Sequence, residues 1–225
     1  MKERATALGV ALCLAVAGLA CSSAEKNVVN QYFGALRAND QGTLTSFAMV
    51  AFDQKVDDFK VLAVGPEAKS PATLPDLVKK VAELDTQQKA NEREYRSWGN
   101  DLAIYPKLEE MKAARAKGGK MSAALQPIAD KFDAFQAKDR ELKKALADAK
   151  AAVEKEKRNV ALSVGQSDDI ETLTGEVLSK DVDLSLTIGG QAKPYVMTLR
   201  KYELTGGSGP RMVSRWVVQS LEPKG

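Results

Sequence analysis

Histidine is absent from this 225-residue sequence. Without an imidazole, the chain has no Ser-His-Asp or Cys-His nucleophile pair, no histidine general base and no histidine metal ligand. This absence excludes most hydrolases. No other residue pattern specifies a reaction, so we expect a protein that is not an enzyme and that has no catalytic residues, no cofactor and no metal site.

A strong charge of either sign is also absent. Lys and Arg number 33, Asp and Glu number 30, and the formal net charge is only +3. This balance argues against a dedicated polyanion binder, so we expect no nucleic-acid partner. The hydrophobic share of 44% and the charged share of 28% are typical of a globular protein. The length is sufficient for one large domain or two small ones.

Cysteine is nearly absent, and its two positions are informative. Cys13 lies inside an apolar run, Ala5–Ala20, that follows a basic N-terminal stretch. The run is shorter than the roughly 20 residues of a membrane-spanning helix and ends in small residues, so we expect residues 1–20 to be a signal peptide. Cleavage leaves Cys21 as the only cysteine of the mature chain, which excludes an internal disulfide.

The end of the apolar run resembles the lipobox of bacterial lipoproteins. Its sequence is Ala-Gly-Leu-Ala-Cys, with Leu19 two residues before Cys21, where the usual pattern has leucine three residues before. The resemblance implies that Cys21 is lipidated and becomes the first mature residue. Acylation also removes a thiol that would otherwise be exposed in an oxidising compartment. Two alternatives stay open: a secreted protein cut near Ala20, and an uncleaved anchor.

These features predict a lipoprotein of the bacterial cell envelope, held on the membrane by its N-terminal lipid anchor. By the sorting habit of such lipoproteins, Ser22 after the cysteine implies the outer membrane, facing the periplasm, if the organism is Gram-negative.

The regions on either side of the chain's centre predict a mixture of helices and strands. Apolar residues at helical spacing up to Leu36 predict a first helix, and Asp40 is suited to cap a second. Alternation between Phe52 and Val64 predicts one strand. Near the C-terminus, alternating patterns separated by glycine-rich turns predict an antiparallel meander with strands at Val182–Ile188, Tyr195–Leu204 and Met212–Leu221, the last containing Trp216.

Residues 75–162 carry two heptad series. The first is Leu77, Val81, Leu84, Gln88, Asn91, Tyr95, Trp98, Leu102 and Tyr105, and the second is Ile128, Phe132, Phe135, Asp139, Leu142, Leu146, Ala149 and Val153. With Gly118-Gly119 between them, they predict a long antiparallel α-helical coiled-coil hairpin with arms 76–117 and 122–160. At roughly 1.5 Å per residue the arms extend about 60 Å, and Pro106 should kink the first arm. Within the seam, Gln88 and Asn91 either specify register or mark a loosely packed stretch.

The segment from Val28 to Asp40, followed by Leu44 and Phe47, resembles the opening helices of the nuclear-transport-factor-2-like superfamily. The resemblance covers residues 21–74 and 163–225. It implies an α+β cone with N-terminal helices on a curved antiparallel sheet, interrupted by the hairpin at 75–162. No catalytic motif carries over. Ketosteroid isomerase, a member of this superfamily, uses Asp and Tyr residues, but none of the available ones can be aligned to those roles; they are Tyr32, Asp53, Asp57, Asp58 and Tyr195.

Four cations are predicted at the hairpin tip, with no acidic residue between them: Lys112, Arg115, Lys117 and Lys120. Cations there either stabilise a helix C-terminus or contact an anionic partner such as a lipid headgroup, an envelope polymer or an acidic protein surface. Elsewhere, Asp181 and Asp183 share one face of a predicted strand. They are either ligands of a cation or a solvated strand end.

We expect a non-catalytic binding or scaffolding module that contacts an envelope protein or an anionic polymer. A small-molecule-binding or enzymatic cone domain and a periplasmic chaperone that uses the hairpin are the alternatives. An open pocket with buried carboxylates would favour the first alternative, and an interior filled by Phe, Leu and Trp would favour the scaffold.

Overall fold

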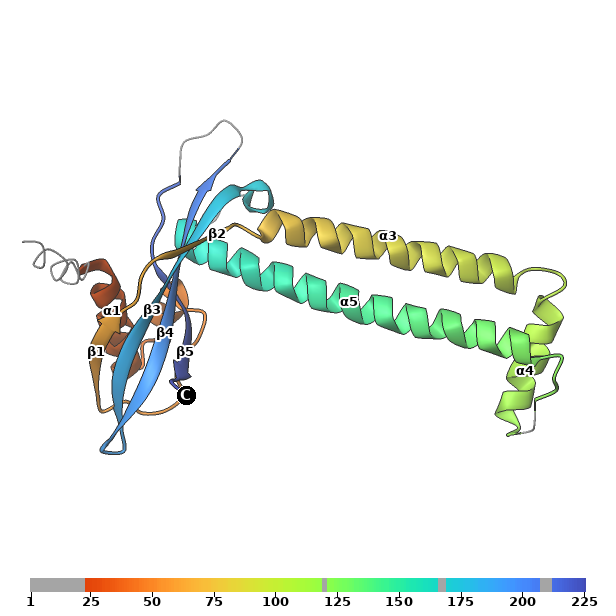
Figure 1. The fold of residues 1–225 in the computed structure, drawn as a ribbon, viewed down its shortest axis with the longest axis horizontal. Coiled ribbons are helices and arrows are strands. Elements are labelled where there is room, and N and C mark those ends of the chain that lie inside the picture. The colour runs from red at the N-terminus through yellow and green to blue at the C-terminus, as the bar shows by residue number, and fades with distance from the viewer. Residues whose placement is uncertain (1–22, 119–120, 166–168, 207–211) are drawn as a thin grey trace, which may run out of the picture. The chain divides into compact units, whose positions relative to one another are not determined.

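The structure is a computed structural model that describes residues 23–118, 121–165, 169–206 and 212–225 (Figure 1). These residues form five α-helices, one short 3-10 helix and five strands, so the α+β class is confirmed. They divide into two compact units. Unit 1 takes its described residues from Met1–Ala72, Asn159–Asp168 and Gly175–Gly225, and unit 2 from Thr73–Arg158 and Asp169–Thr174.

Unit 1 contains two whole helices, the end of a third and one antiparallel sheet. Its elements are α1 (Ser23–Arg37), α2 (Gln41–Phe47), β1 (Asp58–Val64), β2 (Ala68–Pro71), β3 (Thr174–Ile188), β4 (Gln191–Thr205) and β5 (Val217–Pro223). The strand order is β1-β3-β4-β5, and β2 pairs with β3 beyond the end of β1. Gly189 and Gly190 join β3 to β4 with φ values of 57° and 76°, which glycine adopts without strain. The predicted turn is therefore confirmed.

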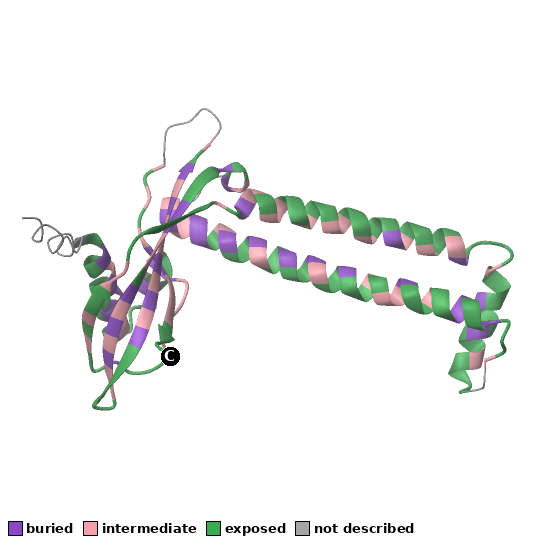
Figure 2. Ribbon diagram, viewed as in Figure 1, coloured by how far each residue is buried: buried purple, intermediate pink, exposed green. Residues whose placement is uncertain are grey.

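The core of unit 1 lies between the two N-terminal helices and one face of the sheet. Helix α1 contributes Val29, Tyr32 and Phe33, which share a helix face because of their three- and four-residue spacing. Inward-facing residues of the strands complete this core, namely Val182, Leu184, Leu186, Met197, Leu199 and Val218. Figure 2 shows the buried positions alternating along β3 and β4, as a sheet with one covered face requires.

Two local interactions fix the boundaries of these elements. Asp40 caps α2 as predicted, because the backbone N–H of Thr43 donates to Asp40 Oδ1 at 2.9 Å. The same hydrogen bonding, led by the Thr43 hydroxyl, lowers the pKa of Asp40. At Gly175 the backbone has φ 147°, and a Cβ there would overlap the carbonyl oxygen of Glu203. Only glycine therefore allows β3 and β4 to approach each other at this point.

Three strand predictions need correction. The first strand begins at Asp58 and not at Phe52, because Phe52 belongs to a loop that packs on Tyr195 with ring centroids 5.4 Å apart. The prediction missed β2, whose four residues are all exposed and so carry no alternating pattern. Trp216 lies directly before β5 and not within it, because that strand starts at Val217.

Unit 2 is helical. It contains α3 (Leu74–Gly99), α4 (Tyr105–Ala116), most of α5 (Gln126–Val164) and the 3-10 helix η1 (Ile170–Thr172). The Thr73 hydroxyl donates to Glu156 Oε1 at 3.4 Å, and the ring centroids of Tyr95 and Phe135 lie 5.6 Å apart. The beginning of α3 therefore lies beside the later part of α5, and its end beside the earlier part. The two helices run side by side in opposite directions (Figure 1).

The second heptad series matches the burial on α5, whereas the first is shorter than predicted. Of the second series, Ile128, Phe135, Leu142, Leu146, Ala149 and Val153 are buried. The first arm does not continue to residue 117, because α3 ends at Gly99 and a turn follows in which Asp101 Oδ1 accepts from the Ala103 N–H at 2.8 Å. Leu102 is 92% exposed and Tyr105 is 54% exposed, so neither belongs to the seam.

Helix α4 folds back on the beginning of α5. Pro106 lies in the first turn of α4, where its missing N–H needs no partner, and so it does not kink a continuous arm. Leu108 and Met111 of α4 form a small core with Ile128 and with two neighbours of it, Leu125 and Ala129. Trp98, at the end of α3, packs against the same core.

Candidate functional site

The predicted lipidation site, Cys21, lies outside the described residues, as do the signal peptide and Lys120. Among the helices that the structure does describe, none combines the length and the apolar character that crossing a membrane requires. The candidate surfaces that can be built from the structure are the basic residues of α4, a buried ion cluster in unit 1 and a recess on unit 1.

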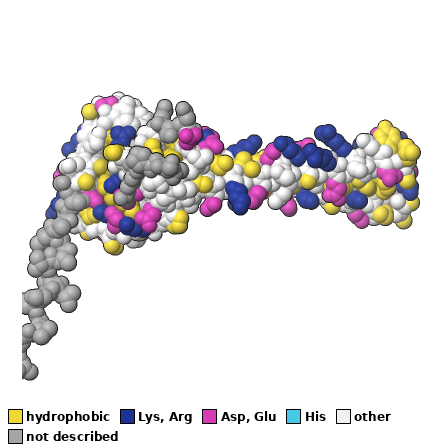
Figure 3. Space-filling view, turned by 90° about the horizontal axis from the view of Figure 1, so that it is seen from above, with side chains coloured by type: hydrophobic (Ala, Val, Ile, Leu, Met, Phe, Trp, Pro, Cys, Tyr) yellow, Lys and Arg dark blue, Asp and Glu magenta, His cyan; other side chains and the backbone are white. Residues whose placement is uncertain are grey.

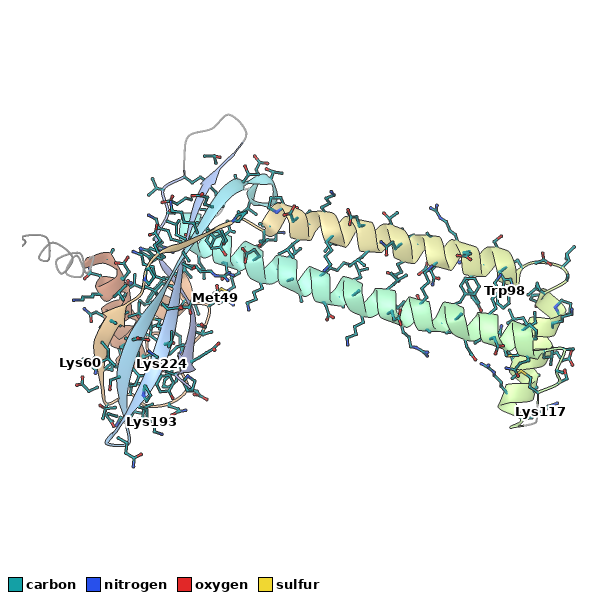
Figure 4. All side chains as sticks on the ribbon, in the orientation of Figure 1. Met49, Lys60, Trp98, Lys117, Lys193 and Lys224 are labelled. Carbon is teal, nitrogen blue, oxygen red and sulfur yellow. The ribbon has the colours of Figure 1, made fainter. Side chains whose placement is uncertain are left out.

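The basic residues of α4 are engaged in ion pairs to different degrees. Lys112 Nζ donates to Glu109 Oε1 at 2.8 Å. Arg115 makes two parallel hydrogen bonds of 2.7 Å to the carboxylate of Asp133, and its guanidinium lies 5.7 Å from the ring centre of Phe132. Lys117 caps the end of α4 and is exposed (Figure 4). Arg115 thus ties α4 to α5.

These ion pairs explain the pKa shifts near α4. The hydrogen bond to Glu109 raises the pKa of Lys112. The hydrogen bonds between Arg115 and Asp133 raise the pKa of the guanidinium and lower that of the carboxyl group. Acids that are distant in the sequence, such as Asp133, therefore offset part of the positive charge that the local sequence predicted. Figure 3 shows further Lys and Arg side chains along unit 2 and hydrophobic side chains at the end that carries α4.

An ion cluster that sequence analysis missed lies at the start of α1. Glu25 is 2% exposed, and its Oε1 accepts from Lys180 Nζ of β3 at 2.6 Å. The same Nζ lies 3.6 Å from Glu67 and 5.2 Å from the ring centre of Trp216. The hydrogen bond to Glu25 raises the pKa of Lys180. The cluster fixes the first turn of α1 to the sheet, four residues after Cys21.

A local signal for this cluster exists in the sequence. Glu25 lies four residues before Val29, so it shares the apolar face of α1. Lys180 lies two residues before Val182 and therefore points to the same side of β3. A charge on the inward face of each element indicates a buried pair, although the two residues are 155 positions apart.

An open recess of about 760 Å³ lies on unit 1. Its polar lining includes Arg37, Asn39, Asp53, Lys55 and Asp57. Two of these side chains have structural partners. Arg37 lies 3.3 Å from Asp58 Oδ1, and Asp57 Oδ2 accepts from the Gly190 N–H at 3.3 Å. The recess is thus an exposed polar surface in which these two residues already hold neighbouring segments together.

The structure places the two tyrosines of unit 1 that were compared with ketosteroid isomerase away from the recess. Tyr32 is buried, donates its hydroxyl to the Val50 carbonyl at 3.1 Å, and has its pKa raised to about 12 by burial. Tyr195 is 5% exposed and packs on Phe52. Neither tyrosine contributes to the lining of the recess that contains Asp53 and Asp57.

Asp181 and Asp183, for which a cation site was weighed against a solvated strand end, each have a partner of their own. Asp181 accepts from the Thr198 hydroxyl at 2.7 Å, and Asp183 pairs with Lys224 at 2.8 Å (Figure 4 labels Lys224). Within the described ranges, no group of three or more Cys, Asp or Glu side chains is placed to hold a metal ion. The arrangement fits the interpretation of a solvated strand face.

Comparisons with protein-family models, with curated proteins and with solved structures found no match for this chain. The assignment of a fold family and of a function therefore depends on the residues and distances described above.

Proposed function

We propose that this protein is a lipoprotein of the bacterial cell envelope that acts as a non-catalytic binding or scaffolding module. In this proposal unit 1 is a nuclear-transport-factor-2-like domain, and unit 2 is a coiled-coil hairpin inserted into it. The lipid on Cys21 holds the protein on the membrane, and unit 2 supplies the surface that contacts an envelope partner.

The observation that carries the scaffold assignment is the filled interior of unit 1. The space between the helices and the sheet is occupied by large side chains that are 0–3% exposed, among them Tyr32, Phe33, Phe47, Leu184 and Met197. A domain that binds or converts a small molecule usually keeps a concave, partly apolar pocket with a few polar groups inside it. A closely packed interior instead favours a function carried by the outer surface.

The anchoring assignment is supported by the position of the only cysteine after the apolar run. Cys21 is separated from α1 by Ser22 alone. Because Glu25 is buried against Lys180, little of the chain remains between the acylated residue and the folded unit. The lipid anchor would therefore hold unit 1 close to the membrane surface.

A deletion combined with crosslinking tests the scaffold assignment. Thr73 contacts Glu156, so residues 75–158 can be replaced by a short Gly-Ser linker without stretching the chain. Residues 159–162 stay because Arg215 Nε donates to the Leu162 carbonyl within unit 1. We expect the shortened protein to unfold cooperatively and to lose the partners that crosslinking and mass spectrometry detect for the full chain in intact cells. Retention of all crosslinked partners would refute a scaffold role for unit 2.

The cations of α4 are the proposed contact for an anionic partner. Changing Lys112, Arg115, Lys117 and Lys120 to Gln should weaken binding to isolated envelope fractions, and added salt should weaken wild-type binding because exposed charges are screened within about 10 Å. The comparison needs a non-lipidated form of both proteins, since acyl chains would dominate membrane partitioning. Equal binding of the two proteins at low salt would assign these residues to helix stability alone.

Small-molecule binding is the second candidate, favoured by the recess of about 760 Å³ on unit 1. Lys55 is one of the residues that line the recess, so an anionic metabolite is the ligand class to screen. Thermal-shift screening of wild type against Lys55→Gln tests this candidate. A ligand that stabilises wild type and not the variant would support it, and no stabilisation by any anion would contradict it.

A further inference from the structure

The carboxylate of Glu25, in the first turn of α1, has one oxygen that the described part of unit 1 leaves unsatisfied. Its Oε1 accepts from Lys180 Nζ at 2.6 Å, whereas Oε2 is buried and has no hydrogen-bond partner among the described residues. Glu25 is 2% exposed, so bulk water does not solvate this second oxygen. A buried carboxylate oxygen without a donor is costly, because it has lost its hydration. A donor from outside the described residues is therefore required.

The residues directly before α1 are the nearest source of such a donor. Helix α1 begins at Ser23, and Cys21 and Ser22 precede it. In a helix every Cα–Cβ bond tilts toward the N-terminus, so a side chain of the first turn lies beside the residues that lead into the helix. The Glu25 carboxylate is thus on the side of α1 from which these two residues enter.

The sequence at the start of α1 has the pattern of a capping box. Ser22 is directly before the helix, which is the N-cap position, and Glu25 is the third helical residue. In a capping box the serine hydroxyl accepts from the backbone N–H of the third helical residue, and the glutamate side chain of that residue accepts from the backbone N–H of the serine. The motif therefore supplies a donor to Glu25 Oε2, the oxygen that the burial analysis identifies as unsatisfied.

We propose that Glu25 holds the mature N-terminus on unit 1 through this capping box. The Ser22 N–H donates to Glu25 Oε2, and the Glu25 N–H donates to Ser22 Oγ. Because Lys180 pairs with Oε1 of the same carboxylate, the box is attached to β3 as well as to α1. Cys21 is then the only residue between the lipid and a fixed part of unit 1.

The consequence for the membrane rests on the proposed function, which places a lipid on Cys21. A lipid attached without a flexible tether gives unit 1 one orientation on the bilayer. The side of unit 1 that faces the lipid headgroups is then the side with the ion cluster, where the Trp216 ring centre lies 5.2 Å from Lys180 Nζ. In this account Glu25 is a positioning residue for the anchor.

Hydrogen exchange at a single amide tests the capping box in the mature chain without its lipid. Cys21-Ser22 is the only Cys-Ser pair of the sequence, so labelling cysteine on its carbonyl carbon and serine on its nitrogen gives one NMR signal for the Ser22 N–H. Two variants in a Lys180→Met background leave no buried charge: Glu25→Gln keeps the acceptor and Glu25→Leu removes it. We expect exchange to be about fivefold slower in wild type and with Gln than with Leu, the factor typical of one cap interaction. Equal exchange in all three proteins would overturn the capping box.

Substitution of the two serines tests the other half of the box. Ser22→Ala should reduce the equilibrium constant for folding about fivefold, because the Glu25 N–H loses its acceptor. Ser22→Thr should retain most of the stability, and Ser23→Ala is the matched control one residue later. Urea unfolding followed by Trp216 fluorescence in a Trp98→Phe background gives these values. Equal effects of the two alanine substitutions would contradict a cap at Ser22.

Fluorescence quenching in vesicles tests the orientation of the lipidated protein. In the Trp98→Phe background Trp216 is the remaining tryptophan, and spin-labelled lipid headgroups quench it only at short range. We expect stronger quenching in wild type than after insertion of eight Gly-Ser residues between Cys21 and Ser22, because the insertion adds a flexible tether of about 15 Å. Equal quenching would overturn the docked anchor. A wild type without lipid by mass spectrometry would refute the proposed function instead, and the exchange of the Ser22 N–H would still decide the capping box.

Discussion

Replacing Lys180 by Met tests how the buried ion cluster stabilises unit 1. The side chain of Lys180 is 18% exposed and that of Glu25 is 2% exposed, so water solvates neither charge well. Without the lysine, the Glu25 carboxylate is left buried, and its Oε2 already lacks a partner among the described residues. Removing one member of a buried pair typically costs about 3 to 5 kcal/mol, because the remaining charge loses its compensation. We expect a loss of that size in the free energy of unfolding.

The assay can be made specific for this cluster. The chain has two tryptophans, and Trp216 lies 5.2 Å from Lys180 Nζ, so a Trp98→Phe background leaves a reporter beside the substituted residue. Urea unfolding followed by its fluorescence gives the free energy. The matched control is the double variant Glu25→Leu with Lys180→Met, which removes both charges and should recover most of the loss. A loss below about 1 kcal/mol for Lys180→Met, or a double variant that is equally unstable, would refute the reasoning.

The pH dependence gives the cluster a second signature. Hydrogen bonding to Glu25 raises the pKa of Lys180 above its usual 10.5. A raised lysine pKa stabilises the folded state below the unfolded value, and the contribution is lost as the pH rises through the folded pKa. Unit 1 of wild type should therefore lose stability at alkaline pH more steeply than the double variant. Parallel stability curves above pH 10 would contradict this assignment.

Three further substitutions probe the two units. Tyr32→Phe removes the hydroxyl that donates to Val50 and should cost about 0.5 to 1.5 kcal/mol in urea unfolding; an unchanged midpoint would argue against the hydrogen bond. Met111→Ala opens a cavity at a fully buried site and should lower the free energy of unfolding by about 2 to 5 kcal/mol, measured by Trp98 fluorescence. A much smaller loss would mean that the neighbouring side chains fill the cavity. Gly175→Ala places a Cβ on a backbone with φ 147° and against the Glu203 carbonyl oxygen, so it should lower the melting temperature. Gly34→Ala is the control, because a Cβ there has open space, and it should have the smaller effect. Equal effects would contradict the close approach of β3 and β4.

Local sequence patterns were sufficient to predict a helix or strand where that element buries one periodic apolar face. Val29, Tyr32 and Phe33 define α1, and the alternation of Val182, Leu184 and Leu186 defines the centre of β3. The prediction was wrong where tertiary contacts decide. The exposed strand β2 has no apolar face and is stabilised by its pairing with β3. The heptad series was extended too far because Leu102 keeps the spacing but follows Gly99 and the turn at Asp101.

The candidate sites show the same limit. The sequence has no acidic residue between Lys112 and Arg115, but Asp133 pairs with Arg115 from another helix. The local sequence therefore did not give the net charge around these cations. Glu25 and Lys180 were each visible as a charge on an inward face, whereas their pairing depends on a fold that brings distant positions together. Surface partners are harder still, since no residue type by itself names what binds there.

The most direct test of membrane anchoring is metabolic labelling with a palmitate analogue in cells that express the full chain. We expect wild type and Cys13→Ser to incorporate the label, because Cys13 lies in the segment removed with the signal peptide, and Cys21→Ser to remain as an unlabelled, unprocessed precursor. Mass spectrometry of the mature N-terminus should locate the lipid on Cys21. A wild type without lipid, together with a Cys21→Ser variant that is still cleaved, would contradict the assignment of this protein as an envelope lipoprotein.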